Sequence, residues 1–530
     1  MAATDVPAAV ARVSRIPTPQ AAMCGTRPKT TAGKCRGGAT AALNQRYYYR
    51  ARAVNSAGVS RYSNLASATR QDPNVFVGGT LAANTTWSPA LGTVTVVSSL
   101  IVPSGITLTM LPGTIVKVTN NASIIAAGGI INIAGTAENK VQLLPLNGTN
   151  IWGQLSAQFP GASLTIRHAD IGYAQTTVYS NAVGLLEDSF FHDYRRAGGS
   201  LFTAPIILTH FAAPMTVRRC HVREYHETLW RNGIQLIEEC LFENVHGDAV
   251  DFDSAQTGTV IRNCTFRHGQ FGNVDAVDVG PGDIAGSFDV RIENCMMYDF
   301  PFDKGVSVGD NNSSRGTIVS NCFIYGCLSG VMAKDRCDVS VRNSTVVNNN
   351  WGFTNYNKVN PSSPTGGGIT TNSYNNIVWG NGVTISMVND SLLYADHNNF
   401  GNTNWPGAGN IDVNPLFLNP GGRDYRLAAN SPCLGAGRDS ADMGAHFPVG
   451  AAMVLSHPRI TEIDTTGANV IVSFWADNEK TYSLLSSPSV DGPWARLADV
   501  PTGMVPRFLS VTNARAPGNR FYRLVTPAQP

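Results

Sequence analysis

The sequence has few charged residues and no long apolar stretch. Only 14% of its 530 residues are Asp, Glu, Lys or Arg, against about 25% in an average domain. The net charge of +2 gives no electrostatic reason to expect a nucleic-acid partner or a charged membrane surface. No run of about 18 apolar residues occurs, so no transmembrane helix is predicted. The first residues, MAATDVPAAVARVSRIP, lack the apolar core of a signal peptide.

The ten cysteines contain no CxxC pair, so a structural zinc site is not expected. Four of them recur at one point of a repeating phrase, separated by 24, 31 and 27 residues: Cys240, Cys264, Cys295 and Cys322. We expect a buried column of free thiols there, because side chains that point the same way from neighbouring coils are poorly placed for a disulfide. An Asn precedes the cysteine in the last three copies, and a ladder of Asn side chains that satisfies the turn backbone is predicted.

The repeat itself has two strand-like phrases. The first phrase reads GDAVDFD from Gly247, VDAVDVG from Val274, DKGVSVGD from Asp303 and SGVMAKD from Ser329. The second phrase, such as VIRNCTF from Val260, follows each copy. A period in the twenties with β-type alternation and no heptads predicts an all-β solenoid, a parallel β-helix.

Alternation along a strand assigns the side chains of the first phrase to two sides. One inward column is predicted to contain Val250, Val277, Val306 and Val331. The outward columns then contain Asp251, Asp278, Ser307 and Met332, followed by Asp253, Gly280, Gly309 and Lys334. At the preceding turn Asp248, Asp275, Lys304 and Ser329 align. We therefore predict one outer face rich in carboxylates, with Lys304 and Lys334, as the candidate working surface.

Composition divides the chain into five parts. Residues 1–44 show no periodicity and are predicted to be disordered or artefactual. Residues 45–71 contain YYYRARAVNSAGVSRYSN from Tyr47, and residues 72–148 are predicted to form the N-terminal cap and first rungs. Residues 149–447 form the predicted body of the solenoid, and residues 451–530 form a predicted small β-sandwich of short strands between Gly, Pro and Asp turns.

Several phrases resemble known families. LTMLPGTIVKV, GGIINIAGT and the NPLF, DYRLAANSPCLGAG and DMGA phrases between Asn414 and His446 resemble the right-handed β-helix repeat family of the pectate-lyase-like superfamily. The segment from Tyr47 to Asn64 resembles the last two strands of a fibronectin type III domain. Residues 451–530 resemble the C-terminal sandwich, an attachment or sorting module, of modular secreted bacterial proteins. These resemblances imply a monomeric, right-handed β-helix at the cell surface or outside the cell, belonging to a longer modular protein.

Two enzyme chemistries fit the acidic face. NVDAVD from Asn273 resembles the NTDGID motif of polygalacturonases, with Asp275, Asp278 and Asp303 as acid and base candidates. Lys304 replaces the second Asp of the family's next motif, GDDC, and its GHG and RIK motifs are absent. In the second chemistry, a polysaccharide lyase, Lys304 or Lys334 is the candidate base if its pKa is lowered. Ca²⁺ would then be held by carboxylates from the set Asp248, Asp251, Asp253, Asp275 and Asp278.

A third resemblance leaves the function open. DKGVSVGD and VMAKD resemble DKGxSxGE and KDxS phrases in β-helices of bacterial proteins that also carry a spore-coat-H-type kinase-like domain, although this chain has no kinase signature. The resemblance implies a surface or polymer-associated β-helix, with Asp310, Asp335 and Asp253 as substrate-binding candidates. The predicted function is polysaccharide binding, with or without cleavage. The alternative is a structural or adhesive solenoid whose Asp and Lys side chains only pair across coils. Exposed aromatic residues near Asp278 would favour sugar binding, and the candidates are Trp230, Trp351 and Tyr356.

Overall fold

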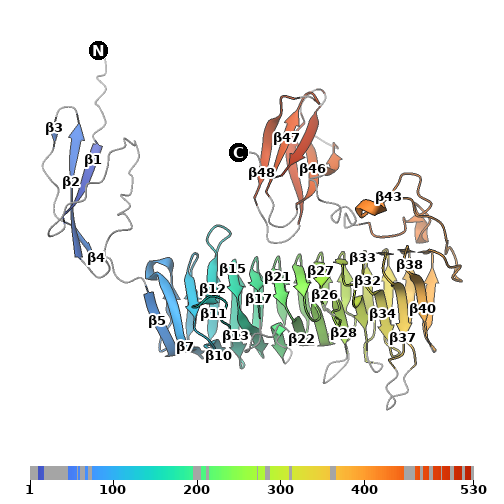
Figure 1. The fold of residues 1–530 in the computed structure, drawn as a ribbon, viewed down its shortest axis with the longest axis horizontal. Coiled ribbons are helices and arrows are strands. Elements are labelled where there is room, and N and C mark those ends of the chain that lie inside the picture. The colour runs from blue at the N-terminus through green and yellow to red at the C-terminus, as the bar shows by residue number, and fades with distance from the viewer. Residues whose placement is uncertain are drawn as a thin grey trace. The chain divides into compact units, whose positions relative to one another are not determined.

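The structure is a computed structural model of the chain (Figure 1). It describes residues 10–16, 46–55, 58–59, 66–69, 74–194, 205–210, 214–270, 272–280, 287–309, 313–358, 366–388, 390–446, 460–465, 469–476, 481–490, 492–501, 507–515, 518 and 520–526. Almost all regular structure in these residues is β-strand. No helix among them is long and apolar enough to span a bilayer.

A small antiparallel sheet forms at the N-terminal end. It contains β1 (Val10–Ile16), β2 (Arg46–Asn55), β3 (Gly58–Val59) and β4 (Ala66–Thr69), with β2 pairing with each of the others. Residues 10–16, predicted as part of an unstructured segment, are therefore a strand. The other residues of 1–44 lie outside the described residues. The fibronectin assignment of 45–71 stays a prediction.

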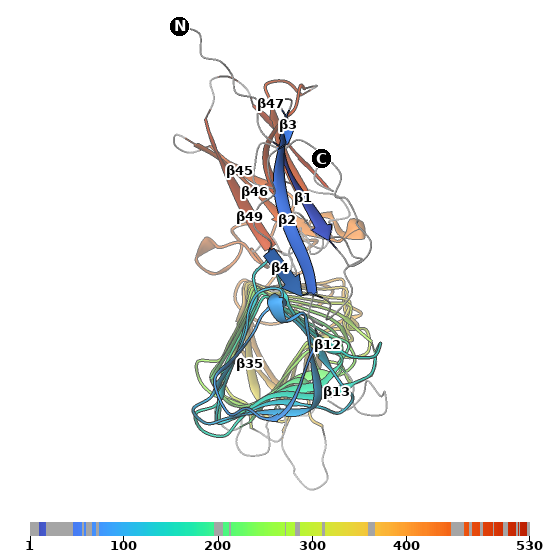
Figure 2. The same ribbon diagram turned by 90° about the vertical axis from the view of Figure 1, so that its left-hand side faces the viewer.

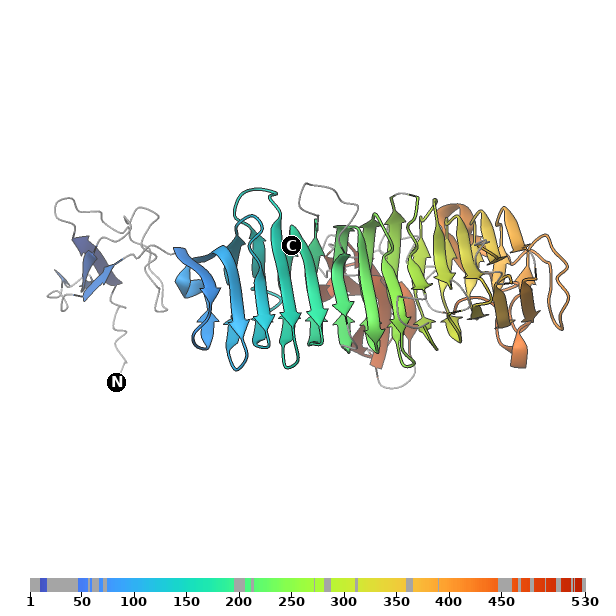
Figure 3. The ribbon, with the colours of Figure 1, turned by 90° about the horizontal axis from the view of Figure 1, so that it is seen from below.

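The body is a parallel solenoid with three faces, and Figure 2 shows its closed, three-sided cross-section. Face 1 consists of β7 (Thr93–Pro103), β10 (Ile124–Ala127), β13 (Trp152–Gln158), β16 (Ala174–Ser180), β19 (Pro205–His210), β22 (Glu227–Gly233), β25 (Val250–Ala255), β28 (Val277–Gly280), β31 (Lys304–Val308), β34 (Ser329–Lys334), β37 (Trp351–Tyr356) and β40 (Val383–Met387). Its strands lie side by side in the view from below (Figure 3).

Face 2 follows the same order. It consists of β9 (Ile115–Val118), β12 (Val141–Pro145), β15 (Ala169–Gly172), β18 (Phe190–His192), β21 (His221–Tyr225), β24 (Leu241–Val245), β27 (Thr265–Gly269), β30 (Met296–Tyr298), β33 (Phe323–Tyr325), β36 (Thr345–Val347), β39 (Ile377–Trp379) and β42 (Asn399–Phe400).

Face 3 is a 13-stranded sheet. It consists of β6 (Thr85–Trp87), β8 (Thr107–Met110), β11 (Ile130–Ala134), β14 (Ser163–Arg167), β17 (Val183–Glu187), β20 (Met215–Arg218), β23 (Gln235–Glu238), β26 (Val260–Arg262), β29 (Arg291–Glu293), β32 (Thr317–Ser320), β35 (Asp338–Arg342), β38 (Ile369–Tyr374) and β41 (Leu392–Asp396). Upstream, β5 (Asn74–Thr80) joins the sheet of faces 1 and 2, and η1 (Pro89–Leu91) is a single 3₁₀ turn.

Each coil has three strands, whereas the sequence pattern suggested two phrases. The second phrase divides at its Asn, because that residue adopts a left-handed backbone that turns the chain sharply. Asn263 has φ of 55° between β26 and β27, and Asn294 and Asn321 repeat the conformation. Asn tolerates this region better than most residues. The predicted Asn ladder is present where Asn321 Nδ2 donates to Asn294 Oδ1 at 2.8 Å.

The predicted inward column is confirmed by the strand register. Val250, Val277, Val306 and Val331 pair in succession, and all are buried. The predicted thiol column is also confirmed, with Cys220 added upstream, and its members are free and buried. The column continues as Ser344, whose Oγ accepts from Cys322 N at 3.1 Å, and then as Asn376, whose Oδ1 accepts from Ser344 N at 2.9 Å. These side chains are therefore hydrogen-bonding turn residues as well as core residues.

A C-terminal segment packs on the downstream coils. It contains β43 (Phe417–Asn419), η2 (Pro420–Gly422), β44 (Asp424–Leu427) and η3 (Arg438–Ser440). Tyr425 packs with Phe323 and Val347 of face 2. The N–H of His446 donates to Asn321 Oδ1 at 2.6 Å, so the segment also caps the Asn ladder.

The last residues form the predicted sandwich of two antiparallel sheets. One sheet contains β45 (Ile460–Asp464), β46 (Asn469–Ala476) and β49 (Arg507–Ala514). The other contains β47 (Tyr482–Ser487), β48 (Ala495–Val500) and β50 (Phe521–Val525). Val472, Phe474, Tyr482 and Leu484 share its separate core.

Candidate functional site

The predicted alignment of acidic residues is present on face 1. Asp251 of β25 pairs in register with Asp278 of β28, and Ser307 of β31 follows. At the corner where face 2 turns into face 1, Asp275 N donates to Asp248 Oδ1 at 2.7 Å. Lys304 N donates in turn to Asp275 Oδ1 at 3.0 Å. The corner and the outward column thus bring carboxylates of two coils together.

Three carboxylates converge there. One oxygen each of Asp248, Asp275 and Asp278 lies within 4.8 Å of the other two. The prediction of an open outer face is wrong in one respect, because Asp275 is only 3% exposed and Asp248 only 8%. The corner packs side chains of successive coils against one another, so the acidic groups are buried even though they lie outside the apolar interior. We call Asp248, Asp251, Asp275 and Asp278 the acidic cluster.

Burial and mutual repulsion make the acidic cluster hard to ionise. Burial, followed by the charges of neighbouring aspartates, raises the pKa of Asp248. The same causes raise the pKa of Asp251 to about 9. Burial also raises the pKa of Asp275 and of Asp278, which the positive charges of Lys304 and Lys334 partly oppose. Without a further cation, Asp251 therefore retains its proton at neutral pH.

The two lysines differ in what the structure shows of them. Lys304 Nζ lies 3.1 Å from Asp275 Oδ1 and also pairs with Asp303. Burial would lower the pKa of Lys304, but these two carboxylates raise it. This direction is opposite to the lowered pKa predicted for a lysine base. Lys334 is buried at the end of β34, and its charge acts on Asp275 and Asp278.

The other predicted residues do not join the acidic cluster. Asp253 forms an ion pair with Arg231 of the preceding coil at 3.1 Å. Asp335 Oδ1 accepts from Lys358 N at 2.8 Å and has φ of 50°, which is a turn-stabilising role. Asp310 lies outside the described residues. Of the predicted aromatic residues, Trp230 is buried, Trp351 is half-buried and Tyr356 is exposed.

Two features of the site were not anticipated from the sequence. Asp278 Oδ1 and Ser307 Oγ are buried and have no hydrogen-bond partner among the described residues. Phe302 is 55% exposed in the turn immediately before Asp303 and Lys304. The sequence signal for Phe302 is its place in FPFDKG, where the preceding Pro breaks the strand alternation.

The acidic cluster has the donor chemistry of a hard-cation site. Ca²⁺ takes six to eight oxygen ligands, and carboxylates are its usual protein ligands. The three converging carboxylates supply such oxygens, and Asp278 Oδ1 has no competing partner among the described residues. A bound cation would offset the repulsion that raises the four pKa values.

A protein-family model matches the part of the chain that contains this site. Residues 228–400 match the family model described as "Right handed beta helix region". The solenoid is a right-handed parallel β-helix. The match extends from β22 to β42 and contains the whole acidic cluster and both lysines. No curated protein sequence matches the chain.

Three solved structures are similar to the chain at low identity. An alginate lyase from Paenibacillus sp. str. FPU-7 is 11% identical, with 56% of this chain and 93% of that chain covered and a TM-score of 0.27. Pectate lyase Pel9A is 14% identical, with 65% and 88% covered and a TM-score of 0.27. The catalytic domain of a GH87 α-1,3-glucanase in complex with nigerose is 10% identical, with 77% and 89% covered and a TM-score of 0.28. At these values the site has to be judged from its own residues.

Proposed function

We propose that this β-helix protein binds a polysaccharide of uronic acids and cleaves it as a Ca²⁺-dependent lyase. The observation that carries the proposal is the convergence of Asp248, Asp275 and Asp278 within 4.8 Å, beside Lys304 and Lys334. A substrate of this kind places the protein at the cell surface or outside the cell.

Each group has a role in the proposed elimination. Asp248, Asp275 and Asp278 would hold the cation, which would supply the positive charge that neutralises the sugar carboxylate and makes the neighbouring C–H more acidic. A base removes that proton, the bond to the leaving glycosidic oxygen at the β-carbon breaks, and a carbon–carbon double bond forms. The leaving oxygen takes up a proton, so the reaction consumes no water.

Lys304 and Lys334 have different roles in the proposed reaction. Lys304 carries a fixed positive charge between Asp275 and Asp303, so it orients carboxylates and helps to bind the anionic polymer. Lys334 is the candidate base, because it is buried near the acidic cluster, where its charge acts on Asp275 and Asp278. A lysine acts as a base only when it is deprotonated, which predicts an alkaline optimum for the reaction.

An inverting hydrolase is less well supported by this geometry. Inverting glycosidases hold their two carboxyl groups about 6.5–9.5 Å apart to admit a water molecule. The oxygens of Asp248, Asp275 and Asp278 lie within 4.8 Å of one another, which suits a shared cation better.

The second candidate function is a structural or adhesive solenoid without turnover. It is favoured by the hydrogen bonds that Asp248 and Asp275 accept from backbone N–H groups of the following coil. In that case the carboxylates would only stabilise the corner, and the acidic cluster would bind no cation specifically.

Calorimetry with Ca²⁺ separates the two candidates. Wild type and the double variant Asp275→Asn, Asp278→Asn would be titrated. A matched control, Asp170→Asn with Asp193→Asn, removes two carboxylates that contact His192 on face 2. We expect wild type and control to bind Ca²⁺ and the cluster variant not to bind. Polyuronates would then be screened for the ultraviolet absorbance of an unsaturated product. Equal Ca²⁺ titrations of all three proteins would overturn the cation site.

A further inference from the structure

The corner between faces 2 and 1 contains further aligned residues downstream of the acidic cluster. Asp275 contacts Lys304 through the backbone bond described above, and Lys304 is in register with Ser329 of the next coil. Ser329 is in register with Trp351, the first residue of β37. One line along the solenoid axis therefore leads from the acidic cluster to a half-buried tryptophan.

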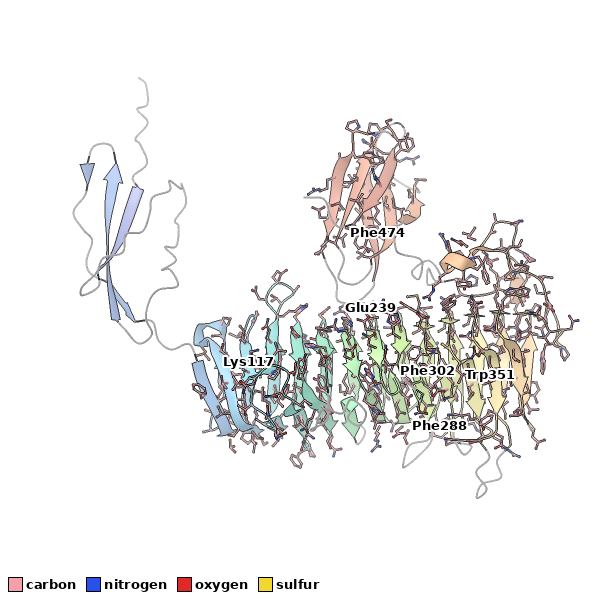
Figure 4. All side chains as sticks on the ribbon, in the orientation of Figure 1. Lys117, Glu239, Phe288, Phe302, Trp351 and Phe474 are labelled. Atoms are coloured by element: carbon pink, nitrogen blue, oxygen red, sulfur yellow. The ribbon has the colours of Figure 1, made fainter. Side chains whose placement is uncertain are left out.

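Phe302 lies beside this line, in the turn two residues before Lys304. The Phe302 side chain is 55% exposed and directly precedes Asp303 and Lys304, so a ligand at the acidic cluster has an aromatic ring nearby. Figure 4 shows Phe302 and Trp351 at the same height on the solenoid, whereas Phe288 lies at its lower edge. Because coils are about 4.8 Å apart, the two coil steps from β31 to β37 separate these positions by about 10 Å along the axis.

We propose that Phe302 and Trp351 are stacking platforms for sugar rings of a polymer that runs parallel to the solenoid axis. This inference rests on the proposed function, since it assigns further binding positions to the same substrate. The C–H groups on one face of a sugar ring pack against the electron-rich face of an aromatic ring. The acidic cluster and Lys304 bind one uronate, and the aromatic rings bind residues further along the chain.

The geometry predicts that affinity depends on substrate length. The acidic cluster lies on β25, β28 and the corners before them, while Trp351 begins β37, three strands beyond β28. A short oligosaccharide that occupies the cation site does not reach Trp351. A longer one contacts Phe302 first and then Trp351.

The test compares Phe302→Ala and Trp351→Ala with Phe288→Ala. Phe288 is the matched control, because it is also an exposed phenylalanine, 43% exposed, but lies where face 1 turns into face 3. Binding of galacturonate oligosaccharides of two lengths would be measured by calorimetry with Ca²⁺ present. Trp351→Phe is added because it keeps a ring at a half-buried position, and Ca²⁺ binding by every variant reports that the site is folded.

We expect Phe302→Ala and Trp351→Ala to weaken binding of the long oligosaccharide about 2- to 10-fold. Trp351→Ala should leave binding of the short one unchanged, and Phe288→Ala should match wild type with both. If wild type binds the long oligosaccharide and both aromatic variants bind it equally well, the stacking platforms are wrong while the proposed function stands. If wild type binds no uronate polymer, the proposed function fails and the inference with it.

Discussion

Two columns of side chains accept backbone hydrogen bonds across coils at the same corner, with different chemistry and in opposite directions. Downstream, Cys327 N donates to Asn349 Oδ1 and Asn349 N donates to Asn381 Oδ1, each at 2.9 Å. Upstream, at a position two residues further along each coil, the carboxylates of Asp248 and Asp275 accept from a backbone N–H of the following coil.

An amide side chain in the downstream column can also form a second hydrogen bond across the coils. Nδ2 of Asn381 also donates to Val346 O at 2.9 Å, a bond that a carboxylate cannot make. Downstream coils have Ser329 and Trp351 at the position of Asp248 and Asp275, so the coil forms there without a carboxylate and the negative charge of the upstream column exceeds what the fold needs. This difference is consistent with the proposed role of the acidic cluster in binding a cation.

The largest expected effect comes from making the amide column acidic. Asn349→Asp would place a carboxylate at a 3% exposed site, next to Asn381 Oδ1 and without a cation. We expect a loss of about 3–5 kcal/mol in the free energy of unfolding, because a buried, unpaired charge is strongly destabilising. Denaturant unfolding at neutral pH measures it. A loss below about 1 kcal/mol would mean that the solenoid tolerates carboxylates anywhere along this corner.

Replacing a carboxylate of the acidic cluster with an amide should lower Ca²⁺ affinity without lowering the stability of the metal-free protein. Asp248→Asn keeps the oxygen that accepts from Asp275 N but removes one charge from the acidic cluster. We expect Ca²⁺ affinity to fall about 10- to 100-fold, while the metal-free protein is at least as stable as wild type. Calorimetry and thermal unfolding in EDTA measure the two quantities. A variant that unfolds more easily in EDTA and binds Ca²⁺ normally would support a structural role.

The pH dependence of stability sharpens the comparison further. A carboxyl whose pKa is raised on folding holds a proton that the unfolded chain has released, so its stabilisation is complete below about pH 4 and is lost as the pH rises. With the pKa of Asp251 raised to about 9, metal-free protein should lose stability from about pH 4 up to about pH 9. Saturating Ca²⁺ should reduce this loss of stability at high pH, because Ca²⁺ binds the deprotonated acidic cluster. Thermal unfolding across this range measures it, with Asp251→Asn expected to show a shallower decline.

The smallest effect is expected in the thiol column. Cys264→Ser should change the free energy of unfolding by less than about 1 kcal/mol, because Ser344 occupies the equivalent position and donates to Arg342 O at 2.8 Å. Thermal unfolding of the variant checks this. A much larger loss would mean that the apolar character of sulfur matters more there than its hydrogen bond.

The sequence alone determined the repeat, the inward valine column, the free thiols and the alignment of acidic residues. These follow from the period of two along a strand and from the recurrence of one phrase per coil. The third strand of each coil could not be predicted from the sequence. The corner that separates it from its neighbour depends on the left-handed backbone of Asn263 and its equivalents, which hydrophobic alternation does not reveal.

Only the tertiary structure decided which aligned residues converge. Asp248, Asp275 and Asp278 come together because the corner of one coil lies against the outward column of the next, whereas Asp253 pairs with Arg231 of the preceding coil. The burial of the acidic cluster and the ion pairs of Lys304 likewise depend on neighbours from other coils. Spacing in the chain gives the register of these residues, but distances, burial and pKa values are properties of stacked coils and exist only after the solenoid has closed.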